Sequence, residues 1–254
     1  MNSRIVIAPG YESLRPLFEQ IARGGGVPAG ATTLYEGRNR VYRLSAGDTV
    51  LCIKAFHTPM ALNCAVYGLL RKGKARRSYD NALRLAAAGI ATPAPVACIE
   101  CRTAGMLGRS YYISLMAEGY AEARYIEQRP DYDALAHSLA QIIHRLRSHG
   151  MLFADFSPGN VLWRRRAGGD IDMMLVDVNR MSFGVTDARK LDRMFGSIVE
   201  SEEACAAIGR RYGRIAGTDP DEAARAAVEA RRRFLASFYR KRRLKKLFLR
   251  KKYE

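Results

Sequence analysis

Alternation of apolar and polar residues predicts β-strands in the first half of the chain. β-branched residues cluster over 4–8, and the stretch Thr33–Phe56 alternates on both sides of a turn signal at 46–48. Further apolar runs rich in β-formers cover 96–101 and 110–116. Short runs separated by turns are typical of an antiparallel sheet.

Later segments change to the spacing of helices. Residues 60–88 are mainly helical in character, and Gly89 is placed to end that helix. A second helix is predicted over 131–148 because apolar residues recur on one face. A pair of strands over 161–164 and 173–176 follows, and the remainder predicts helices.

This order of elements predicts an α+β fold of two unequal lobes. The N-lobe is a small antiparallel β-sheet with one helix, and the C-lobe is mainly helical. A hinge is expected near 116–120. The expected divisions are a lead-in over 1–30, the N-lobe over 31–116, the C-lobe over 117–230 and a basic amphipathic helix over 231–254.

Charge is distributed unevenly along the chain. Lys and Arg number 42 against 25 Asp and Glu, which gives a net charge of +17. Residues 231–254 hold twelve of the cations and a single acidic residue, so this segment carries +11 and the other 230 residues carry +6. Because 48% of the residues are apolar, the chain can bury a core, which excludes an intrinsically disordered protein.

The basic segment has two interpretations. Over 232–252, aromatic and aliphatic residues interleave with the cations at helical spacing, which favours binding to an anionic membrane surface. A solvated helix with one face packed on the domain explains the same pattern. Nucleic acid is not an expected partner, because no recognition motif accompanies the charge and the rest of the chain carries only +6.

The cysteines and the hydropathy indicate the compartment. The five cysteines are odd in number and mostly lie in apolar runs, so we expect reduced thiols. Cys98 and Cys101 have the C-x-x-C spacing of zinc ligands, but the absence of a second pair favours alternating strand positions. Without an apolar stretch that could span a bilayer, we expect a cytoplasmic protein, peripheral on the inner membrane through its basic segment.

Four polar residues stand where phosphoryl transfer would need them. Asp155 and Asn160 are separated by a Pro-Gly turn, and Asp177 ends an apolar strand further along the chain. This chemistry uses one carboxylate for the acceptor hydroxyl, and an amide oxygen with a second carboxylate for magnesium. Lys54 lies in the middle of an apolar strand, where its ammonium is costly unless it meets an anion. Singly, the Asp and Asn residues are explained equally well as turn and cap residues.

These segments together carry a resemblance to a known family. D-F-S-P-G-N at 155–160, V-D-V-N-R-M at 176–181 and the I-K pair at 53–54 resemble the protein-kinase-like fold. Within that fold, the sequence resembles the lipopolysaccharide kinase family, which phosphorylates Kdo or heptose sugars of the inner core. In element order the resemblance covers roughly residues 30–200.

The resemblance implies a role for each of the four residues. Asp155 matches the catalytic aspartate that orients the sugar hydroxyl and accepts its proton, and Lys54 matches the lysine that holds the α- and β-phosphates. Asn160 and Asp177 match the two magnesium ligands. The implied cofactors are ATP and Mg²⁺, and the implied acceptor is a saccharide or saccharolipid.

The nucleotide-binding part departs from the usual pattern. Gly37 is the only glycine in the turn that would cover the nucleotide, so Arg38 and Arg40 are expected to supply charge in place of backbone contacts. The helix acid expected to pair with Lys54 is Asp80, the only acidic residue of that helical stretch.

A second departure leaves other functions open. Phe153 and Ala154 replace the histidine and arginine that commonly precede the catalytic aspartate, which argues against regulation by a phosphorylated activation loop. A catalytically weak pseudokinase or binding module is therefore one alternative. A kinase acting on another small molecule or on a protein hydroxyl is a second, and a nucleic-acid-associated kinase-like protein is a third that rests only on the basic segment.

Overall fold

The chain folds into two compact units. A computed structural model describes residues 2–57, 72–103 and 106–250, with side chains described as far as Arg243. The first unit comprises Met1–Gly119 with Val176–Arg180, and the second comprises Tyr120–Leu175 with Met181–Glu254. The division thus falls three residues beyond the expected boundary, and residues 176–180 return to the first unit.

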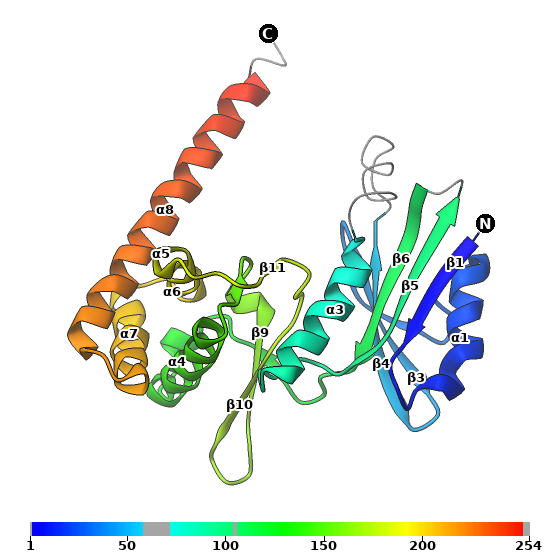
Figure 1. Ribbon diagram of the computed structural model, residues 1–254, viewed down its shortest axis with the longest axis horizontal. Coiled ribbons are helices and arrows are strands. Elements are labelled where there is room, and N and C mark those ends of the chain that lie inside the picture. The colour runs from blue at the N-terminus through cyan, green and yellow to red at the C-terminus, as the bar shows by residue number, and fades with distance from the viewer. Residues whose placement is uncertain (1, 58–71, 104–105, 251–254) are drawn as a thin grey trace. The chain divides into compact units, whose positions relative to one another are not determined.

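The first unit is built on a six-stranded antiparallel sheet with the strand order β1-β5-β6-β4-β3-β2 (Figure 1). The strands are β1 (Asn2–Ile7), β2 (Thr32–Glu36), β3 (Arg40–Ala46), β4 (Thr49–Phe56), β5 (Pro95–Thr103) and β6 (Met106–Leu115). The antiparallel sheet predicted from the sequence is confirmed. Before the turn at 46–48, however, the chain forms two strands, because a tight turn closes where the Gly37 amide donates to the Asn39 carbonyl.

Residues 1–30 are part of the first unit, whereas the sequence predicts only a lead-in before it. β1 pairs with β5 along its whole length. Helix α1 (Arg15–Gln20) inserts Phe18, which is fully buried, into the core beside Leu51 and Ile113. The sequence alone did not indicate this, because a short β-branched run does not identify its partner strand when that strand lies far along the chain.

The two faces of the sheet are covered by different helices. Leu51 of β4 is buried on the face that α1 covers. Since side chains alternate along a strand, Lys54 and Phe56 lie on the other face. There Phe56 packs with Tyr79 of helix α3, which spans Lys74–Ala87. This helix confirms the second half of the helical prediction over 60–88; residues 58–71 lie outside the described residues.

The second unit is mainly helical, as predicted. Its helices are α4 (Tyr132–Ser148), α5 (Ala188–Leu191), α6 (Arg193–Ile198), α7 (Glu202–Ala216) and α8 (Pro220–Arg250). Strands β7 (Ala121–Glu122), β9 (Val161–Arg165) and β10 (Ile171–Leu175) form one small sheet, and β8 (Leu152–Phe153) pairs with β11 (Met181–Ser182). The predicted helix over 131–148 is confirmed, with Leu135, Leu139 and Ile143 fully buried.

As far as Arg250, the basic segment is the distal part of a longer helix. α8 begins at Pro220, because the Ala-rich stretch before residue 231 is strongly helix-forming. Ala224 and Ala227 are buried against the rest of the unit, whereas Phe238 and Tyr239 are 51% and 60% exposed. Across the described part of the chain, no helix is both long and apolar enough to cross a lipid bilayer.

The role of the N-terminal residues can be tested by a core truncation. Phe18→Ala should lower the free energy of unfolding by about 3–5 kcal/mol, because it removes a fully buried ring from the core. Leu83→Ala is the matched control, since Leu83 is 44% exposed on α3. Urea unfolding followed by circular dichroism measures both variants. Equal, small losses for the two would mean that residues 1–30 are only a lead-in.

Candidate active site

Lys54 is held on the sheet face that α3 covers, and it meets a carboxylate there. Its Nζ lies 2.7 Å from Asp177 Oδ1, and the two side chains are only 17% and 32% exposed. The ammonium also lies 5.7 Å from the centre of the Phe56 ring. A lysine in an apolar strand is expected to meet an anion, and in the structure that anion is the Asp177 carboxylate.

The segment 176–180 is fixed to the first unit by a second contact. Asn81 of α3 donates from Nδ2 to the Val178 carbonyl at 2.7 Å, and both residues are buried. Asn179 donates from its own amide to the Asp177 carboxylate. Asp177 itself has a φ of 55°, a left-handed conformation that Asp adopts more readily than most residues. The carboxylate is therefore held between Lys54 and Asn179 on a constrained backbone.

Asp80 does not pair with Lys54, which corrects the expectation from the sequence. Its carboxylate binds Lys72 Nζ at 2.6 Å and Arg76 Nε at 2.8 Å. Adjacent helix residues point about 100° apart, so the register of α3 that directs Asn81 inward directs Asp80 towards Arg76, one turn earlier. The residue of α3 that binds the segment after Asp177 is Asn81, an amide on a helix otherwise rich in cations.

Positive charge gathers around Asp177. Lys74 begins α3, and burial is the main reason why its pKa lies below that of an ordinary lysine. The nearby charges of Arg38 and Arg77 lower that pKa further, while Asp177 opposes them. Arg38 is exposed in the turn between β2 and β3, next to Gly37. The sequence alone does not identify Lys74, because it is one lysine within a basic stretch and belongs to no recognisable motif.

Asp155 and Asn160 lie together in the second unit, on the loop between β8 and β9. Asn160 donates from Nδ2 to the Asp155 carbonyl at 2.9 Å, which leaves its Oδ1 directed elsewhere as an acceptor. Ser197 of α6 donates to the Phe156 carbonyl at 2.5 Å. Phe156 and Phe153 are buried and pack edge to face, with ring centres 6.1 Å apart. Phe153, where a histidine is usual, therefore anchors this loop by apolar packing.

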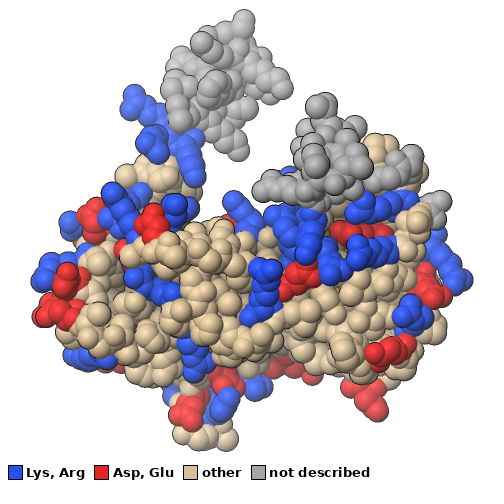
Figure 2. Space-filling view, viewed as in Figure 1, with Lys and Arg blue, Asp and Glu red and all other residues tan. Residues whose placement is uncertain are grey.

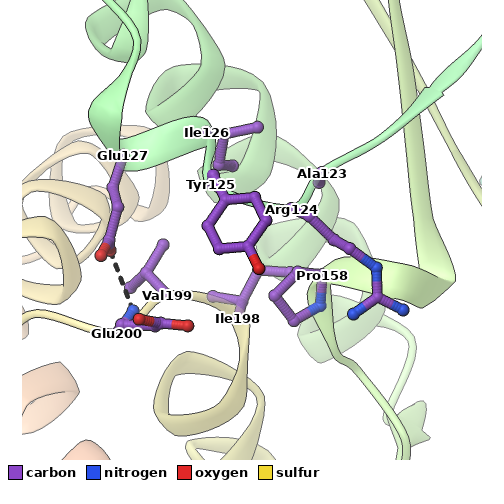
Figure 3. Close-up of a pocket in the computed structure, with 9 residues that line it drawn as sticks. All are labelled: Ala123, Arg124, Tyr125, Ile126, Glu127, Pro158, Ile198, Val199 and Glu200. Atoms are coloured by element: carbon purple, nitrogen blue, oxygen red, sulfur yellow. Dashed lines mark hydrogen bonds between the residues drawn. The ribbon is translucent and has the colours of Figure 1, made fainter.

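A pocket lies beside the same loop. Figure 3 shows the Tyr125 ring between Arg124 on one side and, on the other, Glu127 bonded to the Glu200 backbone amide. That hydrogen bond is 2.9 Å long. The pocket is lined by Ala123, Arg124, Tyr125, Ile126, Glu127, Pro158, Ile198, Val199 and Glu200. Tyr125 has a φ of 57° and is 66% exposed, so its backbone conformation holds an aromatic ring at the mouth.

Arg124, which lines the same pocket, also lies against the turn that carries Asn160. A Cβ atom on Gly159 would lie 2.5 Å from a nitrogen of the Arg124 guanidinium, so this arginine packs closely against the turn and would have to shift for any larger residue. Arg124 is also ion-paired with Glu122 of β7. The pocket wall next to the loop that carries Asp155 and Asn160 therefore includes charged and aromatic side chains.

The donor set fits magnesium rather than a softer metal. Within the described ranges, no three His, Cys, Asp or Glu side chains lie together as a metal site. Cys98 and Cys101 are free thiols buried in different cores, on opposite faces of β5. The expected ligands Asp177 and Asn160 offer a carboxylate and an amide oxygen, the hard donors that Mg²⁺ takes in small number together with phosphate oxygens and water.

Comparison with solved structures defines the class of fold. WaaP in complex with acyl carrier protein is similar with a TM-score of 0.63 at 18% identity, over 94% of this chain and 97% of that one. The Rio2 kinase–ADP/Mg²⁺–phosphoaspartate complex from Chaetomium thermophilum has a TM-score of 0.50 at 15% identity, over 91% of this chain and 78% of that one. The chain has the α+β, two-lobed protein-kinase-like fold that its sequence predicts.

The family follows from the sequence itself. Residues 62–202, more than half of the chain, match the lipopolysaccharide kinase (Kdo/WaaP) family, and the chain belongs to that family. No curated protein matched the chain. Family membership implies ATP-dependent phosphoryl transfer in general terms, and the roles of the individual site residues stay predictions.

The placement of the 176–180 segment can be tested without any ligand. Asn81→Ala should speed amide hydrogen exchange at 176–180, because it removes the buried donor to the Val178 carbonyl, a loss of about 1–3 kcal/mol. Asp80→Ala is the control, since its partners Lys72 and Arg76 lie away from the segment. Faster exchange in the Asp80 variant, with none in the Asn81 variant, would reverse the assignment.

Proposed function

We propose that this protein transfers the γ-phosphoryl group of Mg²⁺-ATP to a sugar hydroxyl of the lipopolysaccharide inner core, on Kdo or heptose. The observation that carries the proposal is the ion pair between Lys54 and Asp177. It brings the two residues expected to bind the nucleotide phosphates and the metal to within 2.7 Å, although they are far apart in the sequence. Family membership supports the general class of reaction.

In this proposal the first unit binds the nucleotide phosphates. Lys54 neutralises the α- and β-phosphates, and Asp177 is the principal carboxylate for the metal. Lys74 and Arg38 add positive charge where a glycine-rich loop would otherwise offer backbone amides, because Gly37 stands alone in its turn. A bound phosphate would raise the lowered pKa of Lys74 again, since it favours the charged form.

In this proposal the second unit binds the acceptor and accepts the proton of its hydroxyl. The Asp155 carboxylate accepts the proton of the sugar hydroxyl as the hydroxyl oxygen bonds to the γ-phosphorus, and the bond to the β–γ bridging oxygen breaks to release ADP. Asn160 would offer Oδ1 to a bound metal, since its Nδ2 already donates to the Asp155 carbonyl. Magnesium, when bound, offsets the negative charge on the transferring phosphate. Arg124 and Tyr125 line the pocket beside this loop and are suited to a sugar.

One departure behind the pseudokinase alternative, the phenylalanine at position 153, has a packing role in this structure. Phe153 departs from the usual histidine, but its side chain is buried against Phe156 and serves to hold the loop. A binding module has no need of Lys54, Asp155 and Asp177 together. A different acceptor remains an outcome of the assay rather than a separate proposal.

Asp155→Asn should reduce phosphoryl transfer by a factor on the order of 10²–10⁴, because a general base and orienting carboxylate contributes about that much. Nucleotide affinity should stay nearly unchanged, since this side chain acts on the acceptor. The measurement uses labelled ATP with magnesium and fractionated lipid-A–core precursors, and isothermal titration with ADP. Asp170→Asn, on an exposed turn, is the control. Equal turnover of parent and Asp155→Asn would end this assignment.

We also propose that the distal part of α8 holds the protein on the anionic cytoplasmic face of the inner membrane. Deleting residues 244–254 removes five cations and one acidic residue, which takes the net charge from +17 to +13. The truncated protein should sediment less with vesicles containing phosphatidylglycerol, because each cation near such a surface contributes about 1 kcal/mol. Turnover on a soluble acceptor should be unchanged. Binding that is the same with and without these residues, or insensitive to salt, would reject the anchor.

A further inference from the structure

A basic groove lies in the second unit between α8 and the segment that contains α5 and α6. Its volume is about 520 Å³. Six cations line it: Arg189, Lys190, Arg193, Arg233, Arg240 and Lys241. Figure 2 shows Lys and Arg side chains gathered along α8. The cations come from two separate elements, so their charges are concentrated by the fold and not only by the sequence of α8.

Most of this charge has no acidic partner among the residues that the structure describes. Lys190 has Asp187 at 3.6 Å, and Arg233 has Glu229 at 3.3 Å. The other four cations of the groove make no ion pair with any residue that the structure describes. Like charges gathered in one groove repel one another, and a bound anion relieves that repulsion. The groove is therefore suited to a ligand with several negative groups.

The groove also has an aromatic surface. Phe234 and Phe238 of α8 stack with their ring centres 6.5 Å apart and their planes at 20°. Phe238 is 51% exposed, which is unusual for a phenylalanine among cations. A flat apolar surface beside positive charge matches a sugar ring that carries phosphate or carboxylate groups. A bare phosphate would gain nothing from the rings.

The walls of the groove are held rigidly together. Arg231, 9% exposed, donates from its guanidinium to the Gly196 carbonyl at 2.9 Å and the Glu200 carbonyl at 3.0 Å. A Cβ atom on Gly196 would lie 2.6 Å from the Ala230 carbonyl oxygen, so glycine is required where α6 meets α8. The groove is thus a fixed feature of the packing between these helices.

Helix α6 connects the groove to the loop that carries Asp155. Arg193, in the groove, begins α6, and Ile198, in the pocket beside that loop, ends it. Six residues of helix span about 9 Å. Between these ends, Ser197 donates to the Phe156 carbonyl next to Asp155. The groove and the loop that carries Asp155 thus lie at the two ends of one short helix.

We propose that this groove binds the phosphate or carboxylate groups of the saccharide acceptor, through Arg189, Arg193, Arg240 and Lys241, with Phe238 against a sugar ring. The inference rests on the proposed function and specifies how an acidic saccharide is selected. It makes the groove a site for the part of the acceptor that does not react.

The test compares two variants with the same net charge. The groove variant replaces Arg189, Arg193, Arg240 and Lys241 with Gln. The control variant replaces Arg214, Arg225, Arg242 and Arg243 with Gln, four exposed cations outside the groove. Isothermal titration without ATP measures binding of a deacylated, phosphorylated inner-core oligosaccharide. Thermal unfolding verifies that both variants are folded.

The parent and the control variant should bind the oligosaccharide within about threefold of each other, and the groove variant at least about 30-fold more weakly. Phe238→Ser should weaken binding of the oligosaccharide but not of inorganic pyrophosphate. Equal binding by both charge variants, or no binding by the parent, would overturn the proposal. Because no turnover is involved, intact binding without phosphoryl transfer would count against the proposed function and still support the groove.

Two further arms separate other sources of negative charge. Vesicles containing phosphatidylglycerol and a single-stranded RNA are tested with the same variants. The proposal predicts no greater loss for the groove variant than for the control in either arm. A loss of vesicle or RNA binding specific to the groove variant, with oligosaccharide binding unchanged, would assign the groove to that ligand and overturn the proposal.

Discussion

The ion pair between Lys54 and Asp177 is the constraint on which the first unit and the candidate site both depend. A lysine in the middle of a strand whose other face is buried core must direct its ammonium to an anion or lose stability. Asp177 supplies that anion, and doing so brings residues 176–180 back to the sheet from a distant part of the sequence. Asn81 completes the attachment by binding the Val178 carbonyl. The arrangement fixes a carboxylate next to a cation, the pair that the proposed function assigns to the metal and the nucleotide phosphates.

Positive charge lies close to the Lys54–Asp177 pair. Gly37 is alone in the turn between β2 and β3, and Lys74 is near enough to both Asp177 and Arg38 for their charges to shift its pKa. The second unit also concentrates positive charge, in a groove whose lining cations outnumber their acidic partners among the described residues. If the protein binds a nucleoside triphosphate and an acidic saccharide as proposed, excess positive charge has a physical reason in both places.

Much of the fold and part of the candidate site can be predicted from the sequence, and the other features cannot, for physical reasons. The strands and the helix over 131–148 follow from periodicity, because each buries one regular face. The expectation that Lys54 needs an anion also followed from its position. Asp80 is not that anion. Adjacent residues on a helix point about 100° apart, and the sequence alone does not fix which residue of α3 faces the sheet beside Lys54. The place of residues 1–30 depends on the pairing of β1 with β5, a long-range contact that a short apolar run does not specify.

Magnesium-dependent binding of ATP tests most directly whether Lys54 and Asp177 form the nucleotide–metal site. Binding at 100-fold saturation should stabilise the parent by about 2.7 kcal/mol, read as a thermal shift with and without Mg²⁺. Asp177→Asn should lose the magnesium-dependent part of this shift, and Lys54→Met should weaken binding with or without the metal. Asp80→Asn, whose partners lie elsewhere, should behave as the parent. A full magnesium-dependent shift in the folded Asp177→Asn variant would contradict the account.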